Sequence, residues 1–281
     1  MKILFAIAAV ILFSSIGYGQ RDIDRMVAAE RAFAEYASAN GTRNAFLEFS
    51  AADGILFLPD KVKTADYWNA QGESPGLLSW APNYADISSN GIIGYTTGNW
   101  EFRAKGKDDV PAGFGQFVTI WQRMPDGKFK FLIDIGISHD KPAQFSTALM
   151  TPSYPTSPNE KRSSAADTAN SFFETAGNFG LNKAYKAFAA EKIRGFREGE
   201  MPILGKDRFL SAIKKLRSKT NFAKHGVFFG TADIAYIANT YTRSVDSKVI
   251  EKGNFVQIWK LIDGRWQIVL DIFKPIPEKL S

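Results

Sequence analysis

The strongest constraint on the fold of this chain is an internal repeat. The segment GQFVTIW at residues 115–121 returns as GNFVQIW at residues 253–259. Each copy is followed by a turn that contains Asp-Gly and then by an apolar segment that ends in Asp-Ile, at 128–135 and at 265–272. A repeat of this kind predicts that one structural unit occurs twice in the chain.

The similarity extends toward the N-terminal side of each copy. GTRNAFLEFSAADGILF at 41–57 aligns with GLNKAYKAFAAEKIRGF at 180–196, and Tyr95 aligns with Tyr236. The offset between the copies drifts only from 138 to 141 residues, so we expect a whole domain to be duplicated rather than a single hairpin.

The segment between the copies, residues 151–164, is rich in Pro and Ser and has no hydrophobic periodicity. Such a composition is typical of a linker. The expected domains are therefore 20–150 and 165–281, which are both of ordinary domain size.

Residues 1–19 have the pattern of a secretory signal peptide. Lys2 provides the positive charge, residues 3–13 form an apolar run too short to span a membrane comfortably, and small residues precede Gln20. Cleavage before Gln20 would give an exported protein, periplasmic or secreted, with no stable membrane anchor. An uncleaved N-terminal anchor is the alternative.

Two rare residue types limit the chemistry. The chain has no cysteine, which excludes disulfides, thiolate metal sites and cysteine nucleophiles, so an exported fold must rely on packing alone. Its two histidines, His139 and His225, are too few for a histidine-rich metal site. We expect no cofactor.

The positive charge of the chain belongs to its second half. Residues 20–150 hold 13 Lys and Arg against 16 Asp and Glu, whereas residues 151–281 hold 21 against 13. Basic residues surround a predicted amphipathic helix at 206–218, where a solvated face or an anion-binding patch would explain them. No nucleic-acid recognition motif is present, so nucleic acid is not an expected partner.

Periodicity predicts the same order of elements in each copy, which is helices followed by an antiparallel meander of strands, an α+β pattern. The expected helices are 23–40, 44–49, 165–177, 183–190 and 206–218. The expected strands of the meander are 92–102, 116–123 and 129–137 in the first copy, and 234–243, 254–262 and 266–273 in the second.

Each copy resembles the SnoaL-like branch of the nuclear-transport-factor-2-like superfamily. The resemblance is carried by ILFLPD at 55–60, by PILGKDRFL at 202–210, and by the two ends that read GxFVxIW, then DG, then DI. The first copy departs from the pattern with Thr64 where the second has Gly205. The resemblance implies two tandem cones, each a curved antiparallel sheet wrapped on about three helices, with an apolar pocket at the open end.

Asp134 and Asp271 end the last strand of each copy and are the main candidates for chemistry. Strand alternation places Phe129, Phe131, Ile133 and Ile135 on one face, with Asp134 on the other. A partly buried carboxylate there would have a raised pKa and would suit a general base. The alternative is that each Asp accepts structural hydrogen bonds and closes its strand.

Two residues are candidates for an acid beside Asp134. His139 follows Asp134 closely, although the second copy has no equivalent histidine. Tyr95 would polarise a carbonyl, as a tyrosine does in isomerase relatives, but its repeat in Tyr236 is explained equally well by packing. His225 has no counterpart in the first copy, so a duplicated catalytic pair is not preserved.

The first copy is the better candidate for a pocket, because it carries an insert at 71–84 that is rich in Gly, Pro and aromatic residues. These aromatics would form a lid or stacking platform, or pack on the other domain. In the second copy, Arg194 replaces Ile55 and is expected to pair with Asp271 and lower its pKa. The expected ligand-binding residues are Trp68, Trp80, Tyr84, Trp100 and Trp121 in the first copy, and Arg194, Tyr241 and Asp271 in the second.

Three functions follow from these features. The first is an exported binder of a small, largely apolar ligand, and the second is a proton-transfer isomerase or lyase that uses Asp134 as base. The third is an interaction protein with paired cones. The two domains are expected to pack as an intramolecular pseudo-dimer, and whether the protein is an enzyme stays open at this point.

Overall fold

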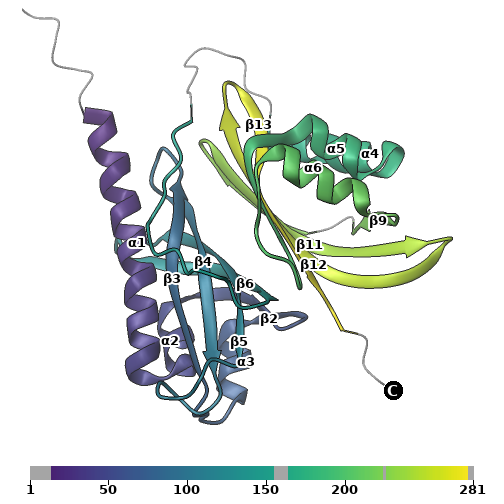
Figure 1. The fold of residues 1–281 in the computed structure, drawn as a ribbon. Helices are drawn as coiled ribbons and strands as arrows, with labels where there is room; N and C mark the ends of the chain where they lie inside the picture. Colours follow the sequence, from purple (N-terminus) through teal and green to yellow (C-terminus); the bar gives the residue numbers. More distant parts are fainter. Residues whose placement is uncertain (1–13, 155–163, 224–225, 278–281) are drawn as a thin grey trace, which may run out of the picture.

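The computed structural model describes residues 14–154, 164–223 and 226–277. The fold is α+β and contains two curved sheets, with helices α1–α3 against the first and α4–α6 against the second, which confirms the expected fold class. Figure 1 shows the helices on the outer sides of the molecule and the two sheets between them.

Several sequence predictions fall on undescribed residues. The predicted signal peptide lies outside the described residues up to position 13, the predicted linker does so from 155 to 163, and so does His225. Among the residues that the structure describes, no helix has the length and apolarity to cross a membrane.

The first unit comprises α1–α3 and β1–β6. Its sheet has the order β2-β1-β6-β5-β4-β3, in which β1 and β6 are parallel and all other neighbours are antiparallel. The elements are α1 (Ser14–Asn40), α2 (Thr42–Phe49), β1 (Ser50–Phe57), β2 (Lys61–Lys63), α3 (Thr64–Ala70), β3 (Leu77–Ile87), β4 (Ile93–Arg103), β5 (Gly113–Arg123) and β6 (Phe129–His139).

The second unit comprises α4–α6 and β7–β13, and its sheet has the order β10-β11-β12-β13-β7-β8, with β9 also paired to β11. Read from the other end, this is the strand order of the first sheet. The elements are α4 (Ala165–Phe179), α5 (Leu181–Phe188), β7 (Ala189–Arg197), β8 (Ile203–Leu204), α6 (Lys206–Lys215), β9 (Lys219–Phe222), β10 (Val227–Thr231), β11 (Ile234–Val245), β12 (Lys248–Ile262) and β13 (Arg265–Pro275).

The repeated glycines at the first two helix junctions have a conformational reason. Gly41 follows α1 with φ of 84° and donates its N–H to the Ala37 carbonyl at 2.9 Å. Gly180 follows α4 with φ of 86° and donates to the Ala176 carbonyl at 3.0 Å. Glycine adopts this left-handed conformation without steric cost, so both copies use it to end one helix and begin the next.

The aromatic part of the insert in the first unit is a strand, although residues 71–76 at its start form no helix or strand. Residues 77–87 form the edge strand β3, which carries Trp80 and Tyr84, whereas Trp68 lies in α3. The register of β3 against β4 shifts between Pro82 and Tyr84. This bulge, together with a proline tolerated at a sheet edge, hides the strand's alternation in the sequence.

A bulge in the last strand of each unit overturns the predicted face assignment. In β6 the register against β5 shifts so that Leu132 is the extra residue, and Phe131 packs on the helix side while Ile133 packs on the opposite side. Asp134 therefore lies on the same face as Phe131, which alternation had placed opposite. Leu132 belongs with Ile133 in the cluster on the other side of the sheet.

The second unit has the same bulge. The register of β13 against β12 shifts at Val269, so Ile268 packs on the helix side and Leu270 on the opposite side. Strict alternation would place Ile268 and Leu270 on one face of the strand, whereas they lie on opposite faces. Because a bulge inserts one residue and reverses every face beyond it, both terminal aspartates point toward the helices.

The non-helical faces of the two sheets share one buried apolar cluster. It includes Ile133 and Ile135 of the first unit with Val256 and Ile272 of the second. Burial of branched side chains from both sheets in one cluster favours a fixed arrangement of the units, since exposing such side chains costs about 1.5–3 kcal/mol each.

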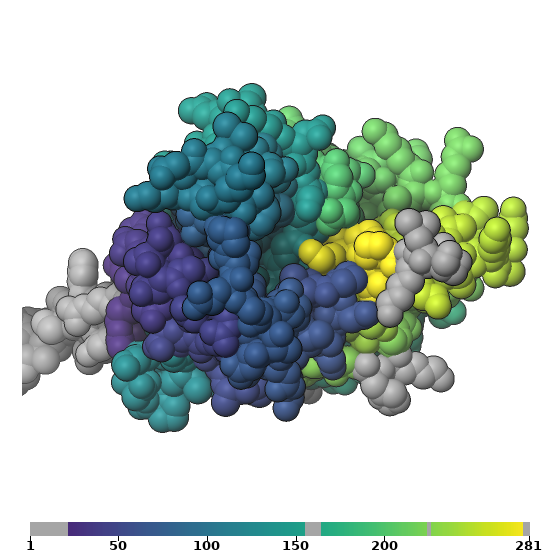
Figure 2. All heavy atoms as spheres, turned by 90° about the horizontal axis from the view of Figure 1, so that it is seen from below, coloured from purple at the N-terminus to yellow at the C-terminus, as the bar shows by residue number. Residues whose placement is uncertain are grey.

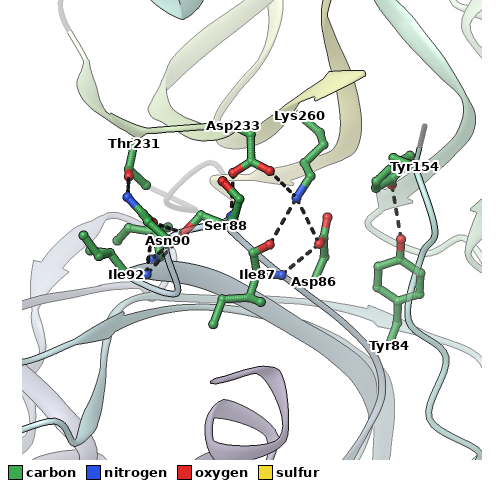
Figure 3. Close-up of polar contacts among 12 residues, drawn as sticks. Tyr84, Asp86, Ile87, Ser88, Asn90, Ile92, Tyr154, Thr231, Asp233 and Lys260 are labelled. Carbon is green, nitrogen blue, oxygen red and sulfur yellow. Dashed lines mark hydrogen bonds and ion pairs between the residues drawn. The ribbon is translucent and has the colours of Figure 1, made fainter. Parts of the chain in front are cut away.

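Polar contacts at the rim of this cluster are shown in Figure 3. Lys260 of β12 is buried, and its Nζ lies 3.2 Å from an oxygen of Asp86 and 3.2 Å from an oxygen of Asp233. It also donates to the Ile87 carbonyl at 3.1 Å. Burial raises the pKa of Asp86 to about 6, although Lys260 opposes the rise.

Candidate functional site

The first unit contains a cavity of about 270 Å³ between its helices and the concave face of its sheet. In Figure 2 the surface is hollowed where the blue and teal atoms of the first unit meet the yellow end of β13. Most of the lining is apolar and aromatic. The main wall residues are Phe33, Phe46, Leu56, Leu58, Tyr67, Trp68, Leu78, Trp80, Trp100, Phe102 and Phe117.

Asp134 of β6 lies on the wall of this cavity. Its Oδ2 accepts a hydrogen bond from the Thr119 hydroxyl at 2.7 Å. Burial raises the pKa of Asp134 to about 7, while the Thr119 bond opposes the rise, the Glu30 charge adds to it and the Lys274 charge opposes it. The carboxyl group therefore gains or loses its proton in the neutral range rather than in acid.

Lys274 reaches the same cavity from the second unit. It lies near the end of β13, and its Nζ donates to the carbonyl of Gly136, two residues beyond Asp134 on the same face of β6. Burial lowers the pKa of Lys274, and the charges of Glu198 and Asp134 oppose that change. The cavity is thus built by one unit and completed by a cation from the other.

Trp100 forms the wall of the cavity above two glycines. Its Nε1 donates to the Gln116 carbonyl at 3.2 Å, and a Cβ built on Gly115 would overlap its ring. At Gly136 a Cβ would lie 3.3 Å from Nε1 of Trp100. The indole therefore rests on bare backbone of two neighbouring strands. Tyr241 covers Gly253 in the same way in the second unit, at the position that the repeat predicts.

A buried carboxylate lies behind the wall. Glu30 of α1 accepts hydrogen bonds from Nε1 of Trp80 at 2.5 Å, from Nε1 of Trp121 at 3.0 Å and from the Thr96 hydroxyl. Burial raises the pKa of Glu30, and these hydrogen bonds oppose the rise. The network fixes the ring of Trp80, whose other side faces Phe33 and the cavity.

Sequence reasoning missed Glu30 and Lys274. A signal for Glu30 was present, since it lies on the apolar stripe of α1 between Met26 and Phe33, and the second copy has Ala169 at the aligned position. Lys274 gave no such signal, because only the pairing of the two units brings it to the cavity.

Asp271 has a different environment in the second unit. It is fully buried, and its oxygens accept hydrogen bonds from the Tyr185 hydroxyl at 2.6 Å and from Nε2 of Gln257 at 2.9 Å. It also forms an ion pair with Arg197. These side chains fill the space around the carboxylate, so Asp271 closes a structural network.

The expectation that Arg194 pairs with Asp271 is wrong, because Arg197 does so. Residues 194 and 197 stand on opposite faces of β7, and Arg194 points to the other unit, where its guanidinium lies 4.4 Å from the centre of the Tyr84 ring. Tyr84 is therefore an interface residue, and its hydroxyl lies 3.4 Å from that of Tyr154. Neither Arg194 nor Tyr84 lines the cavity.

Tyr95 and His139 do not share a cavity with Asp134. Tyr95 pairs with Ile120 in the apolar cluster between the sheets, whereas Thr119 and Asp134 face the helices. His139 lies on the face of Ile137, and its Nδ1 is 2.6 Å from the Asp140 carbonyl. The predicted acids for Asp134 are thus separated from it by the sheet.

The remaining predicted residues divide between wall and surroundings. Trp68, Trp80 and Trp100 line the cavity. Trp121 is fully buried behind it and bonds Glu30. Tyr241 lines a separate, charged recess of about 240 Å³ in the second unit and donates its O–H to Glu251 at 2.6 Å.

Among the described residues, no group of three or more His, Asp or Glu side chains is placed to hold a metal ion. The acidic side chains nearest the cavity, Asp134 and Glu30, are instead bonded by hydroxyl and indole donors.

Comparison with known proteins gives structural neighbours only. No family model and no curated protein sequence matches the chain. One similar solved structure is an NTF2-like protein of unknown function from Shewanella oneidensis, 22% identical, which covers 38% of this chain and 97% of its own with a TM-score of 0.33. Another is a protein described as a putative ketosteroid isomerase from Parabacteroides distasonis, 14% identical over 41% of this chain and 87% of its own, TM-score 0.34. A third is an NTF2-like protein from Cytophaga hutchinsonii, 11% identical over 41% of this chain and 100% of its own, TM-score 0.34.

Proposed function

We propose that this protein binds a small, largely apolar organic ligand in the cavity of its first unit. The observation that carries the proposal is the cavity itself, which has about 270 Å³ of space and aromatic walls, with Asp134 and Lys274 as the acidic and the basic residue of its lining. Small-molecule sites usually have apolar walls with a few polar groups among them. The ligand's apolar body would lie against Trp68, Trp80 and Trp100.

The first unit is favoured over the second because of what surrounds the equivalent aspartates. Tyr185 and Arg197 occupy the space beside Asp271, whereas Phe46 stands at the position of Tyr185 in the first unit and leaves the carboxyl of Asp134 facing the cavity. A site whose space is filled by side chains in this way has no room for a ligand.

We further propose that the protein is exported and that its two units form a fixed intramolecular pair. The signal-peptide pattern at residues 1–19 supports export. The cluster shared by the two sheets and the ion pairs of Lys260 support the pairing. The pairing matters for function, since Lys274 reaches the cavity only when the units are held together.

The test is binding of a neutral apolar probe, 2-naphthylmethanol, to the full mature chain, followed by tryptophan fluorescence and by calorimetry. Three tryptophans line the cavity, so an occupied cavity should change their emission. Leu58→Trp narrows the cavity at its edge, because Leu58 lines it and is 43% exposed. We expect this variant to weaken binding about 10-fold or more, as expected when a ligand's apolar contact is blocked.

The matched control introduces the same leucine-to-tryptophan change at a site outside the cavity. Leu204 of the second unit is 42% exposed and does not line the cavity, so Leu204→Trp should bind the probe as the wild type does. Equal binding by the two variants, or no binding by the wild type, would reject the cavity as the ligand site.

A second candidate function is proton transfer with Asp134 as general base. The specific observation is that burial raises the pKa of Asp134 to about 7, close to the value that suits a base at neutral pH. Exchange of an acidic C–H of 2-naphthylacetone in D₂O, followed by NMR, tests it. Catalysed exchange that is lost in Asp134→Asn would support an enzyme, while exchange at the buffer rate would leave only binding.

A further inference from the structure

Lys260 and Lys274 of the second unit differ in how their charges are compensated. Lys260 is buried, and Lys274 is partly buried. Lys260 has two carboxylates within 3.2 Å, from Asp86 and Asp233, and also donates to a backbone carbonyl. Lys274 donates to the Gly136 carbonyl, and among the described residues no carboxylate comes within ion-pair distance of its Nζ. A partly buried ammonium group without a close counter-ion suits a site where an anion is supplied from outside.

The position of Lys274 is well defined. Its neighbour across the ladder, Asn254, is buried and donates from Nδ2 to the Pro59 carbonyl at 2.6 Å. Pro59 directly follows Leu58 at the edge of the cavity. This contact holds the paired strands β12 and β13 against the first unit. Together with the bond from Nζ to the Gly136 carbonyl, it fixes the ammonium group of Lys274 in the cavity wall.

The polar end of the cavity has one cation among three carboxyl groups, so it accepts an anion when Asp134 is protonated. Asp134 from β6 and Lys274 from β13 line it, Glu30 from α1 lies behind Trp80, and Glu198 lies beyond Lys274. Glu198 already accepts a hydrogen bond from the Ser138 N–H at 3.2 Å. When Asp134 holds its proton, Lys274 is the one charged side chain of the lining and the Asp134 carboxyl is an O–H donor, and together they match a carboxylate.

We propose that the ligand of this cavity is a small apolar monocarboxylic acid, and that Lys274 anchors its carboxylate while the aromatic wall holds its body. The inference rests on the proposed binding function and adds the chemical class of the ligand. Lys274 supplies a charge-assisted hydrogen bond to one carboxylate oxygen. Asp134 in its protonated form donates to the other oxygen, so the ligand anion and the Asp134 carboxyl share one proton between them.

The experiment compares three probes with one ring system: 2-naphthoate, 2-naphthylmethanol and 2-naphthylmethylamine. Their dissociation constants are measured by calorimetry on the full mature chain at about pH 6, where Asp134 is mostly protonated. We expect the acid to bind about 10-fold or more tightly than the alcohol, and the amine to bind weakest, because a hydrogen bond to a charged group strengthens binding by at least that factor.

Variants of Lys274 separate the anchor from the fold. Lys274→Met and Lys274→Gln should each remove the preference for the acid, so that the acid and the alcohol bind each variant with dissociation constants within about 3-fold of each other, and an unchanged circular dichroism spectrum reports an intact fold. Lys61→Met is the control for net charge, because Lys61 is exposed on β2 and does not line the cavity. This variant should keep the preference.

The outcomes distinguish a failure of the carboxylate assignment from a failure of the proposed binding function. Equal binding of acid and alcohol, or a preference that survives in both Lys274 variants, overturns the carboxylate assignment and leaves the apolar binder. Tightest binding of the amine overturns it as well and makes Asp134 the anchor of a cation. Binding of none of the three probes rejects the proposed function and this inference together.

Discussion

Asp134 and Asp271 occupy the same place in the two units and have different surroundings. Each follows a bulge in the last strand, and each points toward the helices. Asp271 accepts from Tyr185, Gln257 and Arg197 and is sealed, whereas Asp134 accepts from Thr119 and lines a cavity. Repetition of an acidic residue therefore shows that the strand geometry is repeated, and its neighbours decide its role.

A second difference between the units lies between the first helix and the sheet. The first unit buries Glu30 under Trp80, Trp121 and Thr96, while the second has Ala169 at the aligned position. The polar network supports the wall of the cavity in one unit, and an apolar helix packs directly on the sheet in the other. The unit with the open cavity is thus also the unit that holds its wall by buried hydrogen bonds.

The largest effect is expected from Asp271→Asn. The change removes the counter-ion of buried Arg197, and breaking one partner of a buried ion pair costs about 3–5 kcal/mol. Urea unfolding at neutral pH should show this loss of stability, and Asp134→Asn is the matched control at the repeated position. An equal loss in both variants would contradict the division of roles between the two aspartates.

The next largest effect is expected from Lys260→Met, which should lower the free energy of unfolding by about 3 kcal/mol. The change leaves the carboxylates of Asp86 and Asp233 without their cation at the interface between the units. Lys274→Met is the comparison and should change the free energy of unfolding by less than about 1 kcal/mol, since its ammonium group lacks such a pair among the described residues. Similar losses in the two variants would show that Lys274 is also a structural residue.

A smaller effect of opposite sign is expected from Asp134→Asn. The folded-state pKa of Asp134 is about 7 and its usual value is 3.8, so the folded protein keeps a proton that the unfolded chain releases. Wild-type stability should therefore fall as pH rises from about 4 to 7. The asparagine variant lacks this loss and should be more stable than wild type at about pH 8, by roughly 2 kcal/mol once partial solvent access is allowed for.

Stability measured by urea unfolding across this pH range checks the effect. Glu30 also has a raised pKa and changes in the same direction, but it does so in both proteins, so the difference between them belongs to Asp134. Parallel pH profiles would show that Asp134 ionises as an ordinary aspartate does.

The smallest effect is expected from Glu30→Gln, with a loss of about 1–2 kcal/mol. The amide group of glutamine faces indole and hydroxyl donors where the carboxylate had accepted, so at least one buried donor loses its partner. The emission of Trp80 should shift in the variant and report a loosened wall. An unchanged emission spectrum with unchanged stability would contradict a supporting role for Glu30.

Much of the fold follows from the sequence because the repeat allows an element to be predicted from two aligned segments. The helices other than α3 and the meander strands were visible as local patterns, since helix periodicity and turn chemistry depend on neighbours in sequence. The edge strand β3 was missed, because the bulge after Pro82 breaks its alternation.

The candidate site was predictable in part. The sequence pointed to Asp134, Trp68, Trp80 and Trp100, which do lie on the cavity wall. It also pointed to Tyr95 and His139, which lie on the other face of the sheet. Asp134 and His139 are five residues apart in β6, so strand alternation places them on opposite faces. The face of Tyr95 depends on the register of β4 against β5, which the sequence does not show.

The sequence by itself determined that one α+β unit is present twice and that each copy ends in an aspartate, because periodicity and turns are local properties of the chain. Only the tertiary structure decided that Arg197 rather than Arg194 neutralises Asp271, and that Lys274 of the second unit completes the cavity of the first. Both facts depend on strand register and on the contact between the two sheets. These are set by packing across the whole molecule, over separations as long as the 138 residues between Gly136 and Lys274.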